Sequence, residues 1–286
     1  MELNEQGLKA LIKESSLELM ESYLAETTKS VTRLSYSEKE NYHTAGNNRI
    51  AGFPDLPAGF QWPLTKEGGR MTFIAQLDLA TLNSADPLQL LPANGMLYFF
   101  MGIDEPAYNI EHKVIWVPSK DDLVLTRPEG STILDDTYEP FTGWKFNAVK
   151  SLMPPNYNYL EEELTDEAFE AYEDMTKQLN TSAGLMWGYP AGQHSDSEIE
   201  AAINIILKKY YDYKPANARQ ALLKHFSGDE AALDHELNNM LMLLELDSAD
   251  ETGFLWWDAG CIHFFIRKED LLNRNFDNTY LSLYSS

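Results

Sequence analysis

Residues 73–79 read FIAQLDL and residues 95–101 read GMLYFFM. Both stretches return in altered form near the end of the chain, as MLLELDS at residues 242–248 and GCIHFFI at residues 260–266. The first stretch alternates between two sets of side chains, as a β-strand with one face in the core does. We therefore predict that the chain uses one β unit twice, as an internal duplication.

A glycine-aromatic-proline step precedes each copy. Gly52 and Pro54 belong to the first step, and Gly188 and Pro190 belong to the second. Glycine and proline favour turns because glycine reaches positive φ and proline fixes φ near one value. These four residues are predicted to be structural turn residues, and they extend the correspondence between the copies beyond one strand pair.

The fold class that follows is α+β, with internally duplicated β units, flanking helices and an amino-terminal helix. A length of 286 residues is enough for roughly two units of about 150 residues each. The predicted segments are an amphipathic helix at residues 1–34, a first α+β unit at 35–158, an acidic connecting helix at 159–182 and a second unit with a helical insertion at 183–286. Together they are expected to form one compact pseudo-symmetric domain.

Hydrophobic periodicity predicts the individual elements. Helices are expected at residues 5–28, with Asn4 as the cap, at 160–179, after the capping-box pair Ser195 and Glu198, and from Pro215 to Gly228. Residues 46–63 are rich in Gly and Pro and should form an ordered loop with short strands at most. Strands are expected at residues 71–79, 97–101, 114–117, 123–126, 145–152, 184–189, 240–246, 255–257, 261–266 and 280–284.

Within residues 71–79, strict alternation would place two sets of side chains on opposite faces. Phe73, Ala75, Leu77 and Leu79 would face one way. Ile74, Gln76 and Asp78 would face the other way.

The chain is strongly acidic. It has 45 acidic and 22 basic residues, which gives a formal charge of −23. This charge repels phosphate backbones and anionic lipid surfaces, so neither nucleic acid nor a membrane is an expected partner. Acidity of this kind either keeps a protein soluble or steers it toward a basic protein partner, and the charge alone does not separate the two. The oligomeric state is not predicted.

Cysteine usage and the amino terminus indicate the compartment. The only cysteine is Cys261, which excludes an intramolecular disulfide. The first residues, MELNE, show no basic region leading into an apolar core, and no later stretch approaches the roughly 20 apolar residues of a membrane span. A cytoplasmic protein is expected.

Four polar side chains at related positions are candidate ligand-binding residues. Gln76 and Asp78 lie two apart in the first copy, as Glu245 and Asp247 do in the second. Such pairs project from one face about 7 Å apart, within the roughly 6.5–9.5 Å between the two carboxyl groups of an inverting glycosidase. The four could line a cleft between the copies. Every i, i+2 pair on a strand has this spacing, so the spacing alone does not indicate a site. Alternatively, these side chains accept hydrogen bonds in turns.

Metal and cofactor signatures are missing. Asp247, Asp250 and Glu251 are the residues considered for a divalent ion, but with Asp258 they do not match the EF-hand spacing. The six histidines form no HExxH or HxxxH pair, and Cys261 lies in an apolar run without a visible activating group. No metal or cofactor is predicted.

Common catalytic motifs are also missing. The chain has no GxSxG elbow, no Walker phosphate loop and no GxGxxG fingerprint. Among the aromatic residues, Trp62 and Trp257 lie in loop-like contexts where they could contact a ligand, while the others are expected to fill the core. Asp258 follows Trp257 and is included among the candidate ligand-binding residues.

Four motifs resemble the YwqG-like family of bacterial proteins: GFPDLPAGFQWP at residues 52–63, FIAQLDL at 73–79, LPANGMLYFF at 91–100 and DAGCIHFFIRKEDL at 258–271. The resemblance covers residues 35–284 and implies an α+β fold that contains a duplication. It implies no activity, because that family is described as a domain of unknown function. Ala51 and Trp257 depart from its pattern, which tends to have glycine at both places.

These observations favour a non-enzymatic binding or interaction protein that presents an acidic surface to a basic protein partner. The alternative is a small-molecule binding protein, with a sugar as one possible ligand, or a hydrolase that uses a carboxylate-lined cleft between the two copies. Gln76, Asp78, Glu245 and Asp247 would carry that alternative.

Overall fold

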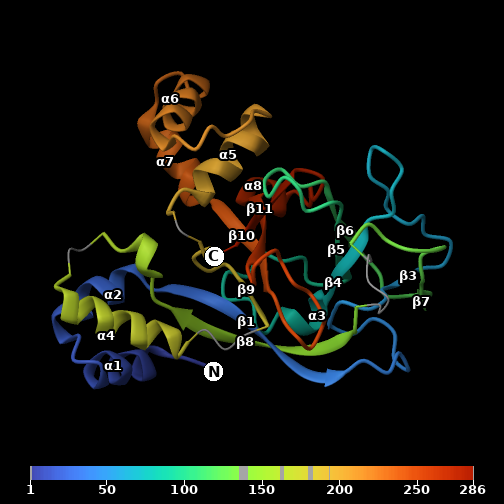
Figure 1. Cartoon of the computed structure of the whole chain (residues 1–286), viewed down its shortest axis with the longest axis horizontal. Coiled ribbons are helices and arrows are strands. Elements are labelled where there is room, and N and C mark those ends of the chain that lie inside the picture. The colour runs from blue at the N-terminus through green and yellow to red at the C-terminus, as the bar shows by residue number, and fades with distance from the viewer. Residues whose placement is uncertain (1, 135–140, 162–163, 180–182, 193, 286) are drawn as a thin grey trace.

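The computed structural model describes residues 2–134, 141–161, 164–179, 183–192 and 194–285 (Figure 1). One large sheet contains β1 (Lys29–Lys39), β2 (Arg49–Ile50), β4 (Thr72–Asp78), β5 (Met96–Met101), β6 (His112–Val117), β8 (Trp144–Met153), β9 (Gly184–Met186), β10 (Met240–Asp247), β11 (Cys261–Arg267) and β12 (Thr279–Tyr284). A small sheet pairs β3 (Asp55–Pro57) with β7 (Leu123–Leu125).

The helices are α1 (Glu5–Glu14), η1 (Glu18–Met20), α2 (Glu21–Thr27), α3 (Leu79–Leu82), η2 (Tyr157–Tyr159), α4 (Asp166–Lys177), α5 (Ser197–Leu207), α6 (Pro215–His225), α7 (Glu230–Asn238) and α8 (Lys268–Leu272). The α+β class is therefore confirmed. Among the described helices, none combines the length and apolar character that crossing a membrane requires.

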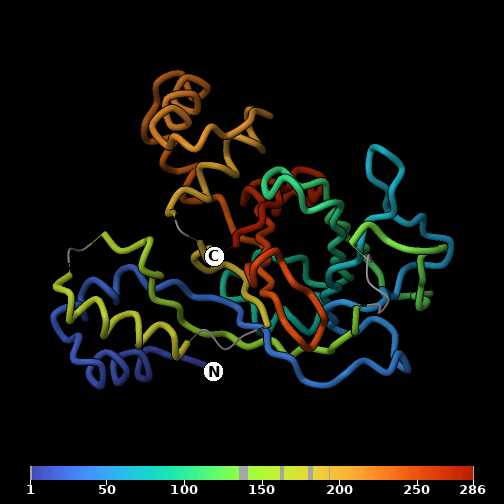
Figure 2. Tube along the Cα trace, in the orientation of Figure 1, coloured from blue at the N-terminus to red at the C-terminus, as the bar shows by residue number. Residues whose placement is uncertain are grey.

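The large sheet has the strand order β12-β11-β10-β9-β1-β8-β2-β4-β5-β6, and all its neighbouring strands are antiparallel. Its two longest strands, β1 and β8, lie side by side at the centre and run across the molecule (Figure 2). Four strands follow on each side of this central pair. Residues from both halves of the chain therefore build one continuous sheet.

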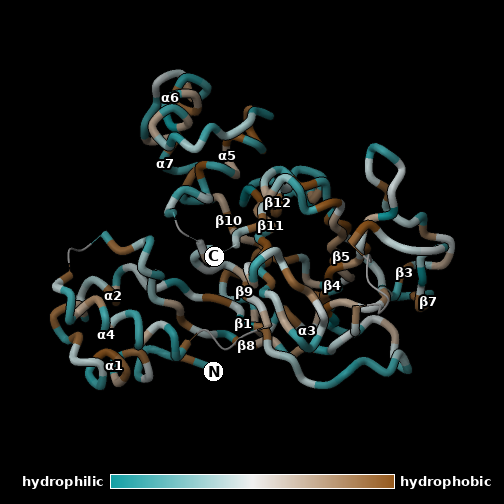
Figure 3. The backbone as a smooth tube through the Cα atoms, in the orientation of Figure 1, coloured by the Kyte–Doolittle hydropathy of each residue, from teal (hydrophilic) through white to brown (hydrophobic). Residues whose placement is uncertain are grey.

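The two edges of the large sheet meet, so the sheet is nearly closed. The Ile110 amide donates to the Leu281 carbonyl at 3.1 Å, and the Leu283 amide donates to the Ala107 carbonyl. Inside, the rings of Phe99 and Phe264 meet edge to face with centroids 4.9 Å apart. Strands β5 and β11 thus share one core, and Figure 3 shows hydrophobic segments along the central strands.

The outer face of the large sheet is covered differently in its two halves. Over β4 and β5 lie the small sheet and its flanking loop, which bury Tyr98 and Phe100. Over β9 to β11 lie α5, α6 and α7, which bury Phe265 and Leu185. The helices α1, α2 and α4 pack together at one end of β1 and β8 (Figure 1).

Strand β4 departs from the predicted alternation because of a β-bulge. The register with β5 shifts between Phe73 and Ala75, so Ile74 is the extra residue. Phe73 consequently packs on the outer face with Tyr98, whereas Ile74 and Ala75 both join the inner core. The prediction that Phe73 and Ala75 share a face is wrong, because the extra residue of a β-bulge changes the face to which every later side chain of the strand points.

The helix predicted over residues 5–28 is interrupted. Its cap is confirmed, since the Asn4 side chain accepts a hydrogen bond from the Gly7 amide. However, α1 ends at Glu14, and Ser16 adopts a left-handed φ of 56°, which an α-helix cannot continue. Helices η1 and α2 follow as separate pieces.

The structure also contains one strand that the sequence does not predict, and two further predictions are wrong. The central strand β1 was not predicted, and residues 255–257 form no strand. The capping box is wrong, because Asp196 precedes α5 and makes no side-chain cap bond. In the predicted connecting helix, α4 spans Asp166–Lys177, while residues 162–163 and 180–182 lie outside the described residues. The short strands expected within residues 46–63 are confirmed as β2 and β3.

The closure of the sheet leads to a prediction about acid stability. His112 bridges the edges, with Nδ1 2.6 Å from the Ile110 carbonyl and Nε2 2.8 Å from Thr279 Oγ1. Burial, aided by Lys113, lowers the pKa of His112 to about 4 from its ordinary 6.5. As the pH falls, His112 is therefore protonated in the unfolded chain before it is protonated in the folded protein. Its contribution to the free energy of unfolding is fully present above about pH 6.5 and is lost as the pH approaches 4.

We expect this one histidine to account for about 2 kcal/mol of the acid destabilisation between pH 7 and pH 4.5, a figure reduced for its partial exposure. Urea unfolding of the wild type and of His112→Gln at both pH values measures it. Carboxylates titrate equally in the two proteins, so the difference isolates His112. An equal pH dependence in both would contradict the prediction.

Candidate functional site

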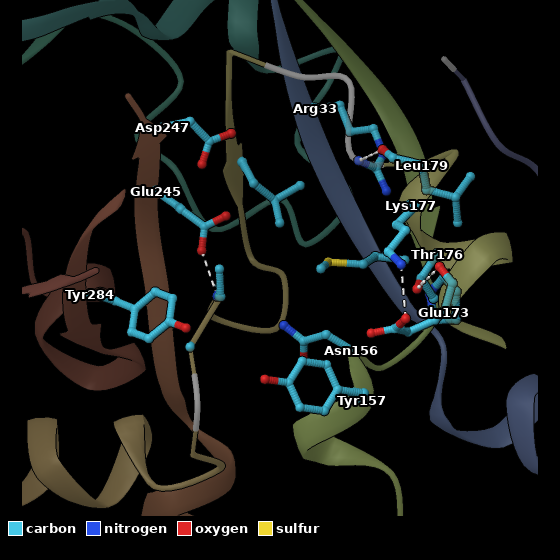
Figure 4. A pocket seen from close by; sticks show the side chains of 15 residues that line it. Arg33, Asn156, Tyr157, Glu173, Thr176, Lys177, Leu179, Glu245, Asp247 and Tyr284 are labelled. Carbon is cyan, nitrogen blue, oxygen red and sulfur yellow. Dashed lines mark hydrogen bonds and ion pairs between the residues drawn. The ribbon is translucent and has the colours of Figure 1, made fainter. Parts of the chain in front are cut away.

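A pocket of about 310 Å³ lies between β10 and the layer formed by η2 and α4, and we call it the β10 pocket (Figure 4). Its walls include the side chains of Arg33, Asn156, Lys177, Leu185, Glu245 and Asp247. Figure 4 shows the two carboxylates on one wall, Arg33 and Lys177 on the opposite wall, and Asn156 between them. The pocket therefore carries charged side chains of both signs beside apolar ones such as Leu185.

The sheet geometry explains why both carboxylates face this pocket. Leu244 and Leu246 point into the closed core, so the alternate residues Glu245 and Asp247 point outward from β10. The Ala191 amide donates to Glu245 Oε2 at 2.8 Å. Glu245 Oε1 and the Asp247 carboxylate are directed toward the pocket (Figure 4).

Asp247 has a strongly shifted protonation equilibrium. Burial and, to a smaller extent, the neighbouring Glu245 charge raise its pKa to about 7, against a smaller opposing effect of His263. Within the described residues, the Asp247 side chain has no hydrogen bond or ion pair. A positively charged group placed beside Glu245 and Asp247 would relieve their mutual repulsion.

The basic residues of the opposite wall are already engaged. Arg33 donates from Nη1 to the Leu179 carbonyl at 2.7 Å and from Nε to Ser151 Oγ at 3.2 Å. Lys177 pairs with Glu173 at 2.8 Å. Burial lowers the pKa of Arg33, while the charge of Glu245 opposes that shift. Neither Arg33 nor Lys177 therefore forms an ion pair with Glu245 or Asp247.

A second group of functional side chains lies behind Glu245. His263 is opposite Glu245 in the β10–β11 register, and Cys261 is opposite Asp247. His263 Nε2 lies 2.9 Å from Glu245 Oε2 and 3.4 Å from Cys261 Sγ. Burial, with the charges of Glu245 and Asp247, raises the pKa of the Cys261 thiol well above its ordinary value. This thiol is not activated as a nucleophile.

Gln76 and Asp78 lie in a different environment. Gln76 Oε1 accepts from the Asp55 amide at 2.8 Å, and Gln76 Nε2 donates to Asp55 Oδ2 at 2.9 Å. Asp78 caps α3 and pairs with Lys120 at 2.8 Å. Neither Gln76 nor Asp78 lines the β10 pocket, which Glu245 and Asp247 line. The four side chains therefore do not meet in one cleft. Both pairs point outward from the nearly closed sheet, and strands β9, β1, β8 and β2 separate β10 from β4.

The network around Gln76 contains charges that sequence reasoning missed. Arg49 is fully buried and binds Glu40 at 2.8 Å and Asp55 at 2.9 Å. Burial opposes the ionisation of Glu40, but hydrogen bonds from the Tyr42 amide and from Arg49 outweigh it and lower the Glu40 pKa. Arg49 lies beside the apolar Ile50 and Ala51, and its partners Glu40 and Asp55 are nine and six residues away. Neither separation matches a helical or strand pattern, so the sequence gives little indication of this network.

The remaining sequence candidates lie outside the β10 pocket. Trp62 donates its indole hydrogen to the Met71 carbonyl at 2.8 Å and packs on Phe100, which is a core role. Trp257 and Asp258 are exposed in the loop before β11. Asp250 and Glu251 are exposed beside a separate hollow that Asp247 also lines.

The two positions that depart from the glycine pattern share one backbone property. Ala51 has a φ of 58° and Trp257 a φ of 50°. Both angles lie in the left-handed region, where glycine is favoured. Among the predicted turn glycines, Gly52 also has a positive φ, of 72°, and an added Cβ there would lie 2.8 Å from the Gly143 Cα.

Comparison with known proteins gives one family. A family model described as "Domain of unknown function (DUF1963)" matches residues 48–284, which is most of the chain. A search of curated proteins returned no match.

Proposed function

The chain belongs to the DUF1963 family, whose description assigns no activity, and we propose from its own residues that it is a binding protein whose β10 pocket receives a guanidinium or ammonium group. The observation that carries this proposal is a comparison within the molecule. In the half of the sheet that contains β4, the buried Arg49 fills the space between the carboxylates of Glu40 and Asp55. In the half that contains β10, the matching place is the β10 pocket.

We further propose that the two halves of the sheet are copies of one unit. Each half contains a bulge at the same point, between Phe73 and Ala75 in β4 and between Met242 and Leu244 in β10. The strand order is also symmetric about β1 and β8, with β4, β5 and β6 matching β10, β11 and β12.

The turns before these strands support the same correspondence. The Asp55 amide donates to Gln76 Oε1 at 2.8 Å, and the Ala191 amide donates to Glu245 Oε2 at 2.8 Å. Both amides follow a glycine-aromatic-proline step. The residue before each step has a left-handed φ, of 58° at Ala51 and 68° at Trp187.

The correspondence identifies what the second half lacks. Arg49 is opposite Gln76 in the register, and Leu185 is opposite Glu245. Leu185 therefore takes the place of Arg49, and Ala191 takes the place of Asp55. A shorter apolar side chain leaves space, and Leu185 and Ala191 both line the β10 pocket. The carboxylates of Glu245 and Asp247 remain, without the cation that the first half supplies from its own chain.

We propose that the cation comes from an arginine or lysine side chain of a basic protein partner. The net charge of −23 would attract such a partner over long distances. A free small molecule with the same cationic group is the second source.

We place this binding protein in the cytoplasm, and we propose that within its family it groups with the YwqG-like proteins, on the motifs quoted above.

Calorimetric titration with two probes tests the proposal. Arginine amide represents a free small molecule, and an arginine-rich peptide represents a partner protein. Glu245→Gln and Asp247→Asn should each weaken binding about 10–100-fold, because each removes a charge-assisted hydrogen bond of about 1.5–3 kcal/mol. Tighter binding of the peptide than of the amide supports the protein partner.

Asp250→Asn is the matched control. It removes the same charge from an exposed residue just beyond β10 and should leave both affinities within about twofold, as expected for an exposed charge. Equal losses of affinity in Asp250→Asn and Asp247→Asn would show that the probes bind by general electrostatic attraction and not in the β10 pocket. No binding of either probe to the wild type would overturn the proposal.

A further inference from the structure

Three metal-ligand side chains meet behind the β10 pocket. Glu245, Cys261 and His263 are all buried, and one ligand atom from each lies within 4.8 Å of the other two. Within the part of the chain that the structure describes, this is the only such set of three or more. It unites three different residue types, one each of oxygen, sulfur and nitrogen ligands.

We propose that Glu245, Cys261 and His263 bind a zinc ion. The distances are close to those that zinc requires. Ligands at about 2.0–2.2 Å for nitrogen or oxygen and about 2.3 Å for sulfur, at tetrahedral angles, lie about 3.4–3.6 Å apart. His263 Nε2 is now 2.9 Å from Glu245 Oε2 and 3.4 Å from Cys261 Sγ. Side-chain rotations that open these gaps by about half an ångström would admit the ion.

The backbone already fixes the ligands in place. Glu245 and His263 are directly opposite each other on β10 and β11, and Cys261 is two residues before His263 on the same face. Side chains opposite each other in an antiparallel pair have Cβ atoms only about 4.5–5.5 Å apart. The site therefore requires no movement of the main chain.

The ligand chemistry selects zinc over calcium or magnesium. Those ions prefer all-oxygen sites, whereas imidazole and thiolate suit zinc. The Cys261 thiol would release its proton to solvent as its sulfur coordinates the ion. Zinc, one thiolate and one carboxylate then sum to no net charge, which suits a buried position.

Two surrounding features fit a metal site with an open position. The Ala191 amide donates to Glu245 Oε2 and orients that carboxylate, as hydrogen bonds to metal ligands do. Three protein ligands leave the fourth tetrahedral position for water, the pattern of zinc sites that bind exogenous ligands. Glu245 also lines the β10 pocket.

The other half of the sheet provides an internal contrast. The residues at the matching register positions are Gln76, Met96 and Tyr98. Gln76 is fully engaged with Asp55, and neither Met96 nor Tyr98 supplies a thiolate or an imidazole. The proposed zinc site is therefore specific to the second half. It shares Glu245 with the cation-binding proposal, whereas its other two ligands, Cys261 and His263, do not line the β10 pocket.

Metal analysis of the purified full chain tests this proposal. The protein is stripped with a chelator, titrated with zinc, and measured for bound metal and for thermal stability. We expect about one zinc per chain and a rise in melting temperature, because the ion binds the native state. Substitution with cobalt should give a thiolate-to-metal charge-transfer absorption, which reports Cys261 directly.

Cys261→Ser should abolish that absorption and weaken zinc binding more than about 100-fold, which is beyond the effect of changing a residue outside the ligand set. His263→Gln should also lose zinc. His112→Gln is the control, because it changes a histidine that is not part of the ligand set and should bind zinc as the wild type does. No zinc on the wild type, or equal zinc on Cys261→Ser, would overturn the proposal.

Two variants separate this site from the cation pocket. Cys261→Ser should lose zinc and still bind the arginine-rich peptide. Asp247→Asn should bind the peptide about 10–100-fold more weakly and still bind zinc, because Asp247 is not part of the three-ligand set. If Cys261→Ser folds poorly, Cys261→Ala provides the same comparison without a polar atom, and circular dichroism confirms its fold.

Discussion

Replacing Arg49 with methionine is expected to lower the free energy of unfolding by about 3–5 kcal/mol, because it strands two buried carboxylates. Arg49 is wholly shielded from solvent and binds Glu40 at 2.8 Å and Asp55 at 2.9 Å. Methionine keeps most of the aliphatic volume but provides no cation. Urea unfolding followed by fluorescence measures the change.

Arg219→Met is the matched control. Arg219 also contacts two carboxylates, Glu230 and Asp234, at 2.7 Å each. Its side chain is 41% exposed, however, so water replaces the lost contacts and we expect a change below about 1 kcal/mol. Comparable losses in the two variants would show that burial does not determine the effect.

A second-site test separates lost packing from uncompensated charge. In the Arg49→Met background, Glu40→Gln and Asp55→Asn remove the two charges while nearly keeping their shapes. We expect this triple variant to recover at least about 1 kcal/mol, because the remaining amides cost less to bury than carboxylates. A triple variant that is less stable than Arg49→Met would assign the loss to packing.

The sequence predicts most strands of the large sheet because their apolar runs are long and bounded by turn residues. It does not predict β1, the central strand, because polar residues interrupt its pattern. Thr32 and Arg33 are buried, but their polar atoms are satisfied by distant carbonyls at Ala85 and Leu179. Such long-range hydrogen bonds leave no periodic signal in the sequence.

The candidate site is predicted in part for a similar reason. The spacing of Glu245 and Asp247 places both on one face of β10, and both do line a pocket. The meeting of Glu245 with His263 depends on the register between β10 and β11, which the intervening loop at residues 248–260 determines. Neighbours within a strand can therefore be derived from spacing, whereas neighbours across strands cannot.

Gly260→Ala is expected to cost about 3 kcal/mol or more, because the new methyl group meets the main chain of the paired strand. A Cβ at Gly260 would lie 1.8 Å from the Tyr284 carbonyl oxygen. Gly95, at the start of β5, faces the same obstacle, since its Cβ would lie 2.2 Å from the Val117 carbonyl oxygen. Neither obstacle is a flexible side chain, so strand pairing itself must shift.

The two glycines also accept equivalent hydrogen bonds, from Leu79 at 3.1 Å to Gly95 and from Ser248 at 3.0 Å to Gly260. If the two halves are copies, Gly95→Ala should destabilise at least as much as Gly260→Ala, with added strain at Gly95 from its φ of 99°. Gly59→Ala is the control, because Gly59 has a φ of 78° but nothing within 4 Å of an added Cβ. Its expected cost of about 1–2 kcal/mol measures backbone strain alone. If Gly260→Ala is as stable as Gly59→Ala, strands β11 and β12 can move apart at little cost in free energy. Their tight pairing would then not be what holds Cys261 and His263 in position.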